Sequence, residues 1–185
     1  MAGLTPYQTV GPFFDFGLAV AGTASIAGEG TAGQRITVGG TVRDGVGQPV
    51  PDALIEIWQA NAAGRYAQAA APGAAPAEDS FRGFGRCPTD NEGQFAFETI
   101  VPGRIAFRES LQAPHLLVGV LARGVQTRLV TRIYFEDQPS NSEDPVLRLV
   151  PPDRRKTLIA RRVADARYEF DVILQGEKET VFFDV

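Results

Sequence analysis

The chain has 185 residues, of which 44% are hydrophobic and 22% charged, and its formal net charge is −4. This length fits one domain with a single sizeable core, and the acidic balance argues against nonspecific nucleic-acid binding, which requires a basic face. We expect one domain over residues 1–185, made of an arm and loop over 1–34 and a folded body over 35–185.

The N-terminus, MAGLTPYQTVGPFFDFGL, has no basic segment followed by a continuous apolar run. Nowhere does the chain approach the ~20 consecutive apolar residues of a membrane span. Cys87 is the sole cysteine, so no internal disulfide can form and a reducing compartment is favoured. We therefore expect a cytoplasmic protein without a membrane anchor, in which Cys87 is a small, partly buried residue.

Apolar and polar residues alternate with period two over most of the chain. Such alternation predicts half-buried strands, which we expect at 35–43, 53–59, 94–100, 104–108, 115–122, 128–135, 168–174 and 180–184. In the 128–135 run, Ile133 falls on an apolar face and Arg132 on the opposite face. Short strands separated by turns predict an all-β fold, a two-sheet antiparallel β-sandwich with an extended N-terminal arm. The segment PPDRRKTLIARR predicts one short helix near 152–161.

Residue chemistry alone provides no complete active site. His115 is the only histidine, and no Gly-x-Ser-x-Gly turn precedes a helix, so a serine or cysteine catalytic triad is disfavoured. One cysteine and one histidine are too few for a zinc site. The segments GFGR and GVGQPVPD lie between strands, with no helix N-terminus behind them to bind phosphate. On these grounds the chain is a β-sandwich of unknown role.

Three segments in order carry a family resemblance: VPDALIEIWQANAAGRY at 50–66, FGRCPTDNEGQFAFETIVPGR at 84–104, and APHLLVGVLARGVQTRLVTRIYFED at 113–137. Together with the opening TPYQTVGPFF and the ending YEFDVILQGEKETVFFDV, they resemble the intradiol ring-cleaving dioxygenases over nearly the whole chain. For an active member, the resemblance implies a ferric ion held by two tyrosinates and two neutral imidazoles. The two histidines form a His-x-His pair, because alternate residues of a strand share a face and both reach one metal.

The resemblance places His115 and Leu117 at the positions of the histidine pair and Ile105 at one tyrosine position. The other tyrosine is expected shortly after GRY, where this chain has only Ala, Gln, Pro and Gly, and Tyr66 within GRY is interpreted as a packing residue. Three of the four ligands are thus replaced by groups that cannot hold iron. We expect no metal and no catalytic residue in this chain, and we interpret His115 as a structural remnant.

In the family's two-chain members, related alpha and beta chains pair and the beta chain holds the Fe(III). The resemblance implies that this chain is an alpha chain, inactive alone, whose complex with a homologous beta chain uses O₂ to cleave protocatechuate to 3-carboxy-cis,cis-muconate. It also implies that the alpha chain lines the substrate pocket with Thr9, Gly11, Pro12, Phe13 and Arg123. A guanidinium at Arg123 suits the carboxylate of protocatechuate.

Several alternatives stand beside these assignments. Arg123 is otherwise a solvated charge at a strand end, and the arm otherwise covers the edge of its own sandwich. Phe13 stands where some alpha chains carry tyrosine, which removes a hydroxyl from the pocket. Two rival functions remain: a non-catalytic binding or scaffold protein derived from the same family, and an enzyme that uses this chain alone with an unrecognised site.

Overall fold

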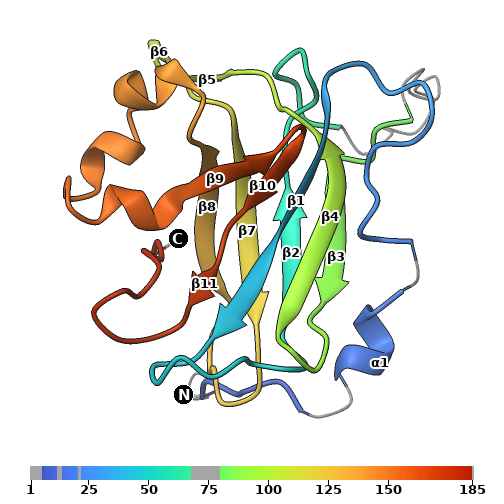
Figure 1. Cartoon of the computed structure of the whole chain (residues 1–185), viewed down its shortest axis with the longest axis vertical. Helices are drawn as coiled ribbons and strands as arrows, with labels where there is room; N and C mark the ends of the chain where they lie inside the picture. Colours follow the sequence, from blue (N-terminus) through green and yellow to red (C-terminus); the bar gives the residue numbers. More distant parts are fainter. Residues whose placement is uncertain (1–5, 12–13, 21, 68–79, 185) are drawn as a thin grey trace, which may run out of the picture.

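A computed structural model describes residues 6–11, 14–20, 22–67 and 80–184. The described residues form an all-β fold, as predicted, with one five-residue α-helix and three short 3-10 helices (Figure 1). The strands are β1 Arg35–Arg43, β2 Leu54–Trp58, β3 Phe84–Pro88, β4 Gln94–Ile100, β5 Ile105–Phe107, β6 Ser110–Gln112, β7 His115–Leu121, β8 Leu129–Phe135, β9 Ile159–Ala164, β10 Arg167–Glu169 and β11 Val172–Ile173. The helices are α1 Phe14–Leu18, η1 Pro139–Glu143, η2 Leu147–Leu149 and η3 Arg155–Leu158.

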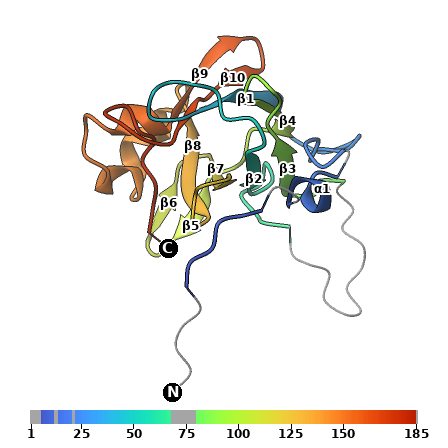
Figure 2. The same ribbon diagram turned by 90° about the horizontal axis from the view of Figure 1, so that it is seen from below.

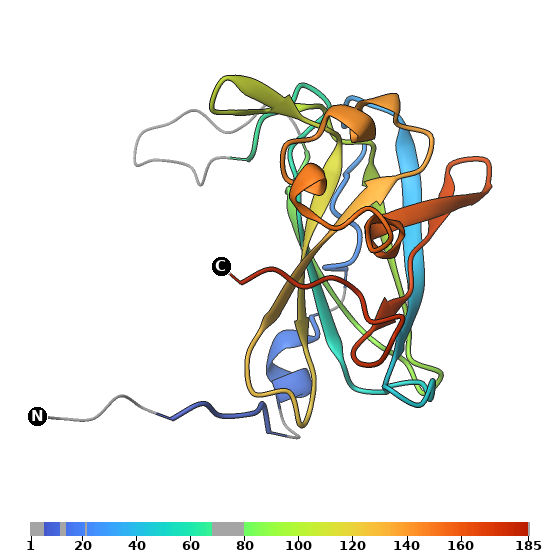
Figure 3. The same cartoon turned by 90° about the vertical axis from the view of Figure 1, so that its left-hand side faces the viewer.

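Nine strands form one continuous sheet in the order β11-β1-β10-β9-β8-β7-β2-β3, with β4 also paired to β1. The sheet folds over into two layers, one with β1 and β4 and the other with β2, β7 and β8 (Figures 1 and 3). The predicted pair of separate antiparallel sheets differs from this arrangement, because β1 pairs in parallel with β10 and β11, and β8 with β9. The β9–β10 hairpin joins the layers, since it bonds to β8 on one side and to β1 on the other.

The core lies between the two layers and follows from the alternation of the strands. The inward-facing residues from β1, β4, β7 and β8 include Ile36, Val38, Phe95, Phe97, Leu116, Val118, Ile133 and Phe135. All of them are buried, and burying large apolar side chains is the main favourable contribution to folding. The predicted faces of the 128–135 run are therefore confirmed.

The strand predictions agree with the structure where the alternation is long and fail for several shorter strands. The runs at 35–43 and 94–100 match β1 and β4 in full. The 168–174 run is split into β10 and β11, and 180–184 is no strand, although Phe183 donates its N–H to Val130 at 2.8 Å. Strands β3, β6 and β9 were not predicted.

The predicted helix near 152–161 is wrong in extent and type. Only η3, four residues of 3-10 helix, forms there, and the chain then continues as strand β9 from Ile159. Ile159 pairs with Tyr134 at the edge of β8, whose backbone groups would otherwise lack partners. Leu158 is buried in a second apolar cluster with Tyr134 and Leu147. Strand pairing and this burial outweigh a short stretch of helical pattern.

The N-terminal segment joins the core at Ile26, whereas residues 6–11 of the preceding arm lie outside it. Residues 6–11 have no regular secondary structure and project from the body (Figures 2 and 3). Farther along, Ile26 is fully buried in the core, and Ser25 and Ala27 form bridges to Glu98 and Phe81. Within the described part of the chain, no helix is long and apolar enough to cross a membrane.

Candidate functional site

The outward face of β2, β3, β7 and β8 carries His115 and Leu117, which the resemblance places at the positions of a histidine pair, and we call it the site face. Its residues line up in rows across the strands; the first two rows are Phe84, Trp58, Leu117 and Arg132, and Arg86, Glu56, Gly119 and Val130. Trp58 and Phe84 are 48% and 41% exposed. This face therefore presents an aromatic and cationic surface beside Leu117.

His115 lies at the buried end of the site face, where it pairs with Tyr134 of β8. Its Nδ1 donates to the carbonyl oxygen of Ala113 at 2.8 Å, and its buried Nε2 has no hydrogen-bond partner among the described residues. Burial, followed by the charge of Arg132, lowers the pKa of His115 to about 4. The imidazole is therefore neutral at pH 7 and is poorly suited to donate a proton.

Arg132 stands opposite Leu117 across β7 and β8. Its Nη1 donates to Gln112 Oε1 at 2.5 Å and to the Tyr134 hydroxyl at 3.2 Å. A guanidinium at this place repels a metal cation, and the Leu117 side chain has no lone pair to offer one. The side chains present do not fit a ferric ion, and among the described residues no group of three or more His, Cys, Asp or Glu could hold a metal.

The positions expected for the two tyrosinates are equally unsuited to iron. Ile105 opens β5, a three-residue strand paired only with β6. Tyr66 packs its ring against Trp58, with the ring centres 5.0 Å apart. Burial raises the pKa of Tyr66, although the charge of Arg132 opposes the rise. The segment after Tyr66 where the second tyrosine is expected lies almost wholly outside the described residues.

The structure brings one residue of the arm to the predicted Arg123 region. The Thr9 hydroxyl accepts the N–H of Gly124 at 2.9 Å, so the arm passes the turn that follows β7. Gly11 lies on the same exposed segment, and a Cβ atom there would meet no atom of this chain within 4 Å. Pro12 and Phe13 lie outside the described residues. No contact among the described residues therefore requires glycine at position 11.

Arg123 lies on this turn, and its nearest anionic partner is Asp52. The Arg123 Nε atom is 2.5 Å from Asp52 Oδ2, and the two side chains are 57% and 31% exposed. Sequence reasoning missed Asp52, because the two residues become neighbours only through the antiparallel pairing of β2 with β7: Leu54 pairs with Leu121, which brings the turn before β2 to the turn after β7.

The arm contact and Arg123 are far from the metal position of this same chain. His115 and Arg123 are separated by eight residues along β7 and its continuation, or roughly 26 Å at ~3.3 Å per residue. One aromatic ring with its substituents is much shorter than that separation. A substrate held by Arg123 therefore cannot also lie against His115 of the same chain.

A buried carboxylate on the site face was also missed. Glu56, 10% exposed, accepts from Arg86 Nε at 2.7 Å and from Arg128 Nε at 2.9 Å. Its signal in the sequence is that it is the one charged residue in the strand ALIEIWQ. One carboxylate between two guanidinium groups leaves a net positive charge on this face.

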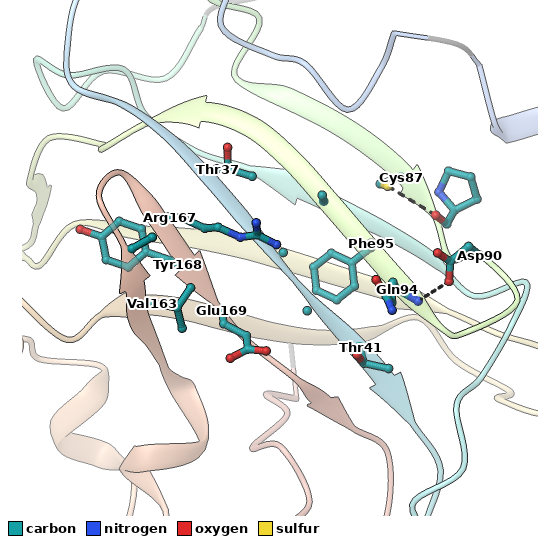
Figure 4. A pocket seen from close by; sticks show the side chains of 15 residues that line it. Thr37, Thr41, Cys87, Asp90, Gln94, Phe95, Val163, Arg167, Tyr168 and Glu169 are labelled. Carbon is teal, nitrogen blue, oxygen red and sulfur yellow. Dashed lines mark hydrogen bonds between the residues drawn. The ribbon is translucent and has the colours of Figure 1, made fainter.

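A groove of about 660 Å³ opens on the opposite side of the fold, over β1, β4 and the β9–β10 hairpin (Figure 4). Thr37, Gln94, Arg167 and Glu169 line it, and Gly39 leaves room at its base. The predicted site residues that the structure describes do not line this groove. The candidate site is therefore on the other layer.

Comparisons with known proteins agree with the resemblance read from the sequence. The profile of a family described as dioxygenase matches residues 11–176. The alpha chain of protocatechuate 3,4-dioxygenase from Burkholderia cepacia is 43% identical over 197 residues, which cover 98% of this chain and 97% of that one. The chain belongs to the intradiol dioxygenase family.

Two further intradiol relatives show how broad the similarity is. The beta chain of protocatechuate 3,4-dioxygenase from Burkholderia cepacia is 39% identical over 80% of this chain and 67% of its own length. Among solved structures, the dioxygenase domain of a dioxygenase carbohydrate-binding protein fusion from Streptomyces sp. SirexAA-E superposes with a TM-score of 0.63, at 28% identity over 93% of this chain and 98% of that one. The intradiol fold is thus shared over almost the full chain.

Proposed function

We propose that this chain is the alpha subunit of a protocatechuate 3,4-dioxygenase and acts only in complex with a homologous beta chain that holds Fe(III). The observation that carries the proposal is the set of side chains at the family's metal position: Leu117 and Ile105 offer no donor, and Arg132 adds a positive charge. The whole-length similarity to an alpha chain supports the same assignment. In the proposed reaction, both atoms of O₂ enter protocatechuate between its hydroxyl-bearing carbons, giving 3-carboxy-cis,cis-muconate.

In this proposal the chain supplies a wall of the partner's substrate pocket. Arg123 orients the substrate carboxylate by a charge-assisted hydrogen bond, and Thr9, Gly11, Pro12 and Phe13 line the pocket from the arm. The separation of Arg123 from His115 supports a pocket shared with another chain rather than one built within this chain.

The proposal includes the organisation and location of the chain. The two layers act as one β-sandwich domain, which is supported by the common core that Ile26 joins from the N-terminal segment. The protein is cytoplasmic in this proposal, in keeping with a single, unpaired cysteine at position 87.

The first experiment compares the chain alone with the chain combined with its beta chain. We expect the purified chain to be colourless, to contain no iron and to consume no O₂ with protocatechuate. We expect the combined chains to form a burgundy complex that consumes O₂ and releases 3-carboxy-cis,cis-muconate. Stoichiometric iron bound tightly by this chain alone would contradict the proposal.

The second experiment tests Arg123 within the assembled enzyme. Arg123→Ala should raise KM for protocatechuate by about tenfold and leave the iron colour unchanged, because a hydrogen bond between charged groups is lost from substrate binding. Arg161→Ala is the matched control, since Arg161 is also an exposed arginine in an ion pair, with Glu169 at 2.7 Å. An unchanged KM in Arg123→Ala removes Arg123 from the pocket.

The exposed aromatic pair Trp58 and Phe84 also suits a second candidate, a non-catalytic binding or scaffold protein. O₂ consumption by the complex of this chain with the beta chain distinguishes the dioxygenase subunit from the scaffold protein. A stable complex with the beta chain whose O₂ consumption equals that of the beta chain alone favours the scaffold function.

A further inference from the structure

We propose that Asp52 is a positioning residue for the recognition of the substrate carboxylate, acting through Arg123. The inference rests on the proposed function and deepens it: Arg123 contacts the substrate, and Asp52 holds the guanidinium in the orientation that this contact requires. Three features of the structure carry the argument, namely the contact itself, the rigidity of the turn that bears Asp52, and the part of the guanidinium that Asp52 leaves available.

The contact is a close ion pair. Asp52 Oδ2 and Arg123 Nε lie 2.5 Å apart. Asp52 lies in the turn that precedes β2 and Arg123 in the turn that follows β7, and the antiparallel pairing of Leu54 with Leu121 brings these two turns to the same end of the layer. The contact therefore follows from the pairing of β2 with β7.

The turn that bears Asp52 is held in place by Thr89. The Ala53 N–H donates to Thr89 Oγ1 at 2.9 Å, the Thr89 N–H donates to the Ala53 carbonyl at 2.8 Å, and the Thr89 hydroxyl donates to the Val50 carbonyl at 2.9 Å. Thr89 and Ala53 are both buried. The backbone on either side of Asp52 is thus fixed to the end of β3.

Asp52 itself has a backbone φ of +61°, in the left-handed region, which it shares with only Arg108 and Ala166 among the described non-glycine residues. Aspartate and asparagine tolerate this conformation better than most residues. Strained backbone of this kind collects at functional sites, where the surroundings hold it. The carboxylate is consequently presented to Arg123 on a rigid support.

The turn that bears Arg123 is held by separate contacts. Gly124 has a φ of +83°, and its N–H donates to the Thr9 hydroxyl of the arm. The Val125 N–H donates to the Ala122 carbonyl at 3.2 Å, and Ala122 is buried. Arg123 therefore extends from an ordered backbone, and the long side chain is the part whose freedom remains to be restricted.

Asp52 engages the Nε side of the guanidinium, which leaves the fork of Nη1 and Nη2 for a second carboxylate. Among the described residues, neither of these two atoms makes a hydrogen bond, and the ion pair with Asp52 involves Nε. Guanidinium groups bind carboxylates through two parallel hydrogen bonds.

Ordering the Arg123 side chain before the substrate arrives reduces the conformational entropy lost on substrate binding. An ion pair this exposed contributes little to folding stability, so the effect of Asp52 falls on substrate binding.

The test uses Asp52→Asn in the assembled enzyme, because asparagine keeps the backbone preference and removes the charge. We expect KM for protocatechuate to rise about threefold to fivefold, with kcat, iron colour and urea unfolding midpoint of the chain unchanged. KM for catechol, which has no carboxylate, should not change. Glu169→Gln, which breaks the exposed pair with Arg161, is the matched control and should leave KM as it is.

A double-mutant cycle separates positioning from any independent role. In the Arg123→Ala background, Asp52→Asn should add no further change to KM, because Asp52 acts on the substrate only through the missing Arg123 side chain. An unchanged or lower KM in Asp52→Asn alone overturns the proposal, and a lower value would mean that Asp52 chiefly repels the substrate. A full additional effect in the double variant also overturns it.

The failure of this inference is distinct from the failure of the proposed function. If the wild-type complex does not cleave protocatechuate, the proposed function is wrong and the proposed role of Asp52 fails with it. A wild-type complex that is active and loses affinity in Arg123→Ala, but not in Asp52→Asn, removes Asp52 alone.

Discussion

Arg128 reaches across Gly119 to Glu56, so that its Nε lies 2.9 Å from Glu56 Oε2 although β7 separates the two chain segments. A Cβ atom on Gly119 would fall on the Arg128 guanidinium. The absence of a side chain at position 119 is what gives Arg128 this path. The ion pair therefore links β2 to the residue that precedes β8, across β7, and Arg86 adds a second guanidinium from β3.

Glu56→Gln should lower the free energy of unfolding by about 2 kcal/mol, because two guanidinium groups lose the one carboxylate between them. Both arginines are partly exposed and regain some hydration, which keeps the loss below that of a fully buried pair. Urea unfolding of the purified chain measures the change. Glu169→Gln, in an exposed pair, should cost no more than ~0.5 kcal/mol. Equal losses in the two variants would contradict the structural role of Glu56.

Alanine substitutions at Gly119 and Gly40 should differ sharply. In Gly119→Ala the new Cβ meets the end of a flexible arginine side chain, which can move aside, so we expect a loss of about 1 kcal/mol. In Gly40→Ala it meets the backbone carbonyl of Phe170, whose N–H is bonded to Gly39 at 2.8 Å. We expect a loss of about 3 kcal/mol there. Comparable unfolding midpoints in urea for the two variants would show that the β1–β10 contact is not as close as described.

The stability of the chain should rise with pH between about 4 and 6.5 through His115. The imidazole titrates near 6.5 when unfolded, and burial lowers its pKa to about 4 in the folded state. Between these values the unfolded state binds more protons, so folding is penalised as pH falls, by roughly 3 kcal/mol once pH is below 4. Above 6.5 this contribution to the pH dependence vanishes.

Urea unfolding at pH 5 and pH 7 measures this dependence, and His115→Gln serves as the control because it retains a polar side chain without a titrating ring. The difference in unfolding free energy between the two pH values should be smaller in the variant than in the wild type. Since His115 is the only histidine, its NMR imidazole signal reports the pKa directly. A signal that titrates near 6.5 in the folded chain would contradict the burial of the ring.

Leu117→His should restore the histidine pair without restoring the metal. The new imidazole would share a strand face with His115, yet Arg132 remains opposite and the tyrosinate at position 105 is still missing. We expect no iron above background after dialysis against ferric citrate, measured by elemental analysis. The homologous beta chain is the positive control. Stoichiometric iron in the variant would show that the leucine alone prevents binding.

The alternation of residues was enough to predict β1 and β4 and the inward face of β8, because these strands bury one face along their whole length. The sequence also shows that Leu117 and Ile105 have no lone pair to offer a metal, whatever the fold; that they stand at former ligand positions stays a prediction from the resemblance. The helix near 152–161 was mispredicted because local pattern carries no information about the open edge of β8.

The charged contacts of the site were decided by tertiary structure. Asp52 and Arg123 are 71 positions apart along the chain, by subtraction of their numbers, and the pairing of β2 with β7 brings the turns that bear them together. Arg132 was predicted to point outward, but its place opposite Leu117 depends on the pairing of β7 with β8. The sequence by itself indicated which strands bury a face, and it shows that Leu117 and Ile105 offer no donor to a metal. Strand register, a long-range property set by the packing of the whole core, decided which charges meet.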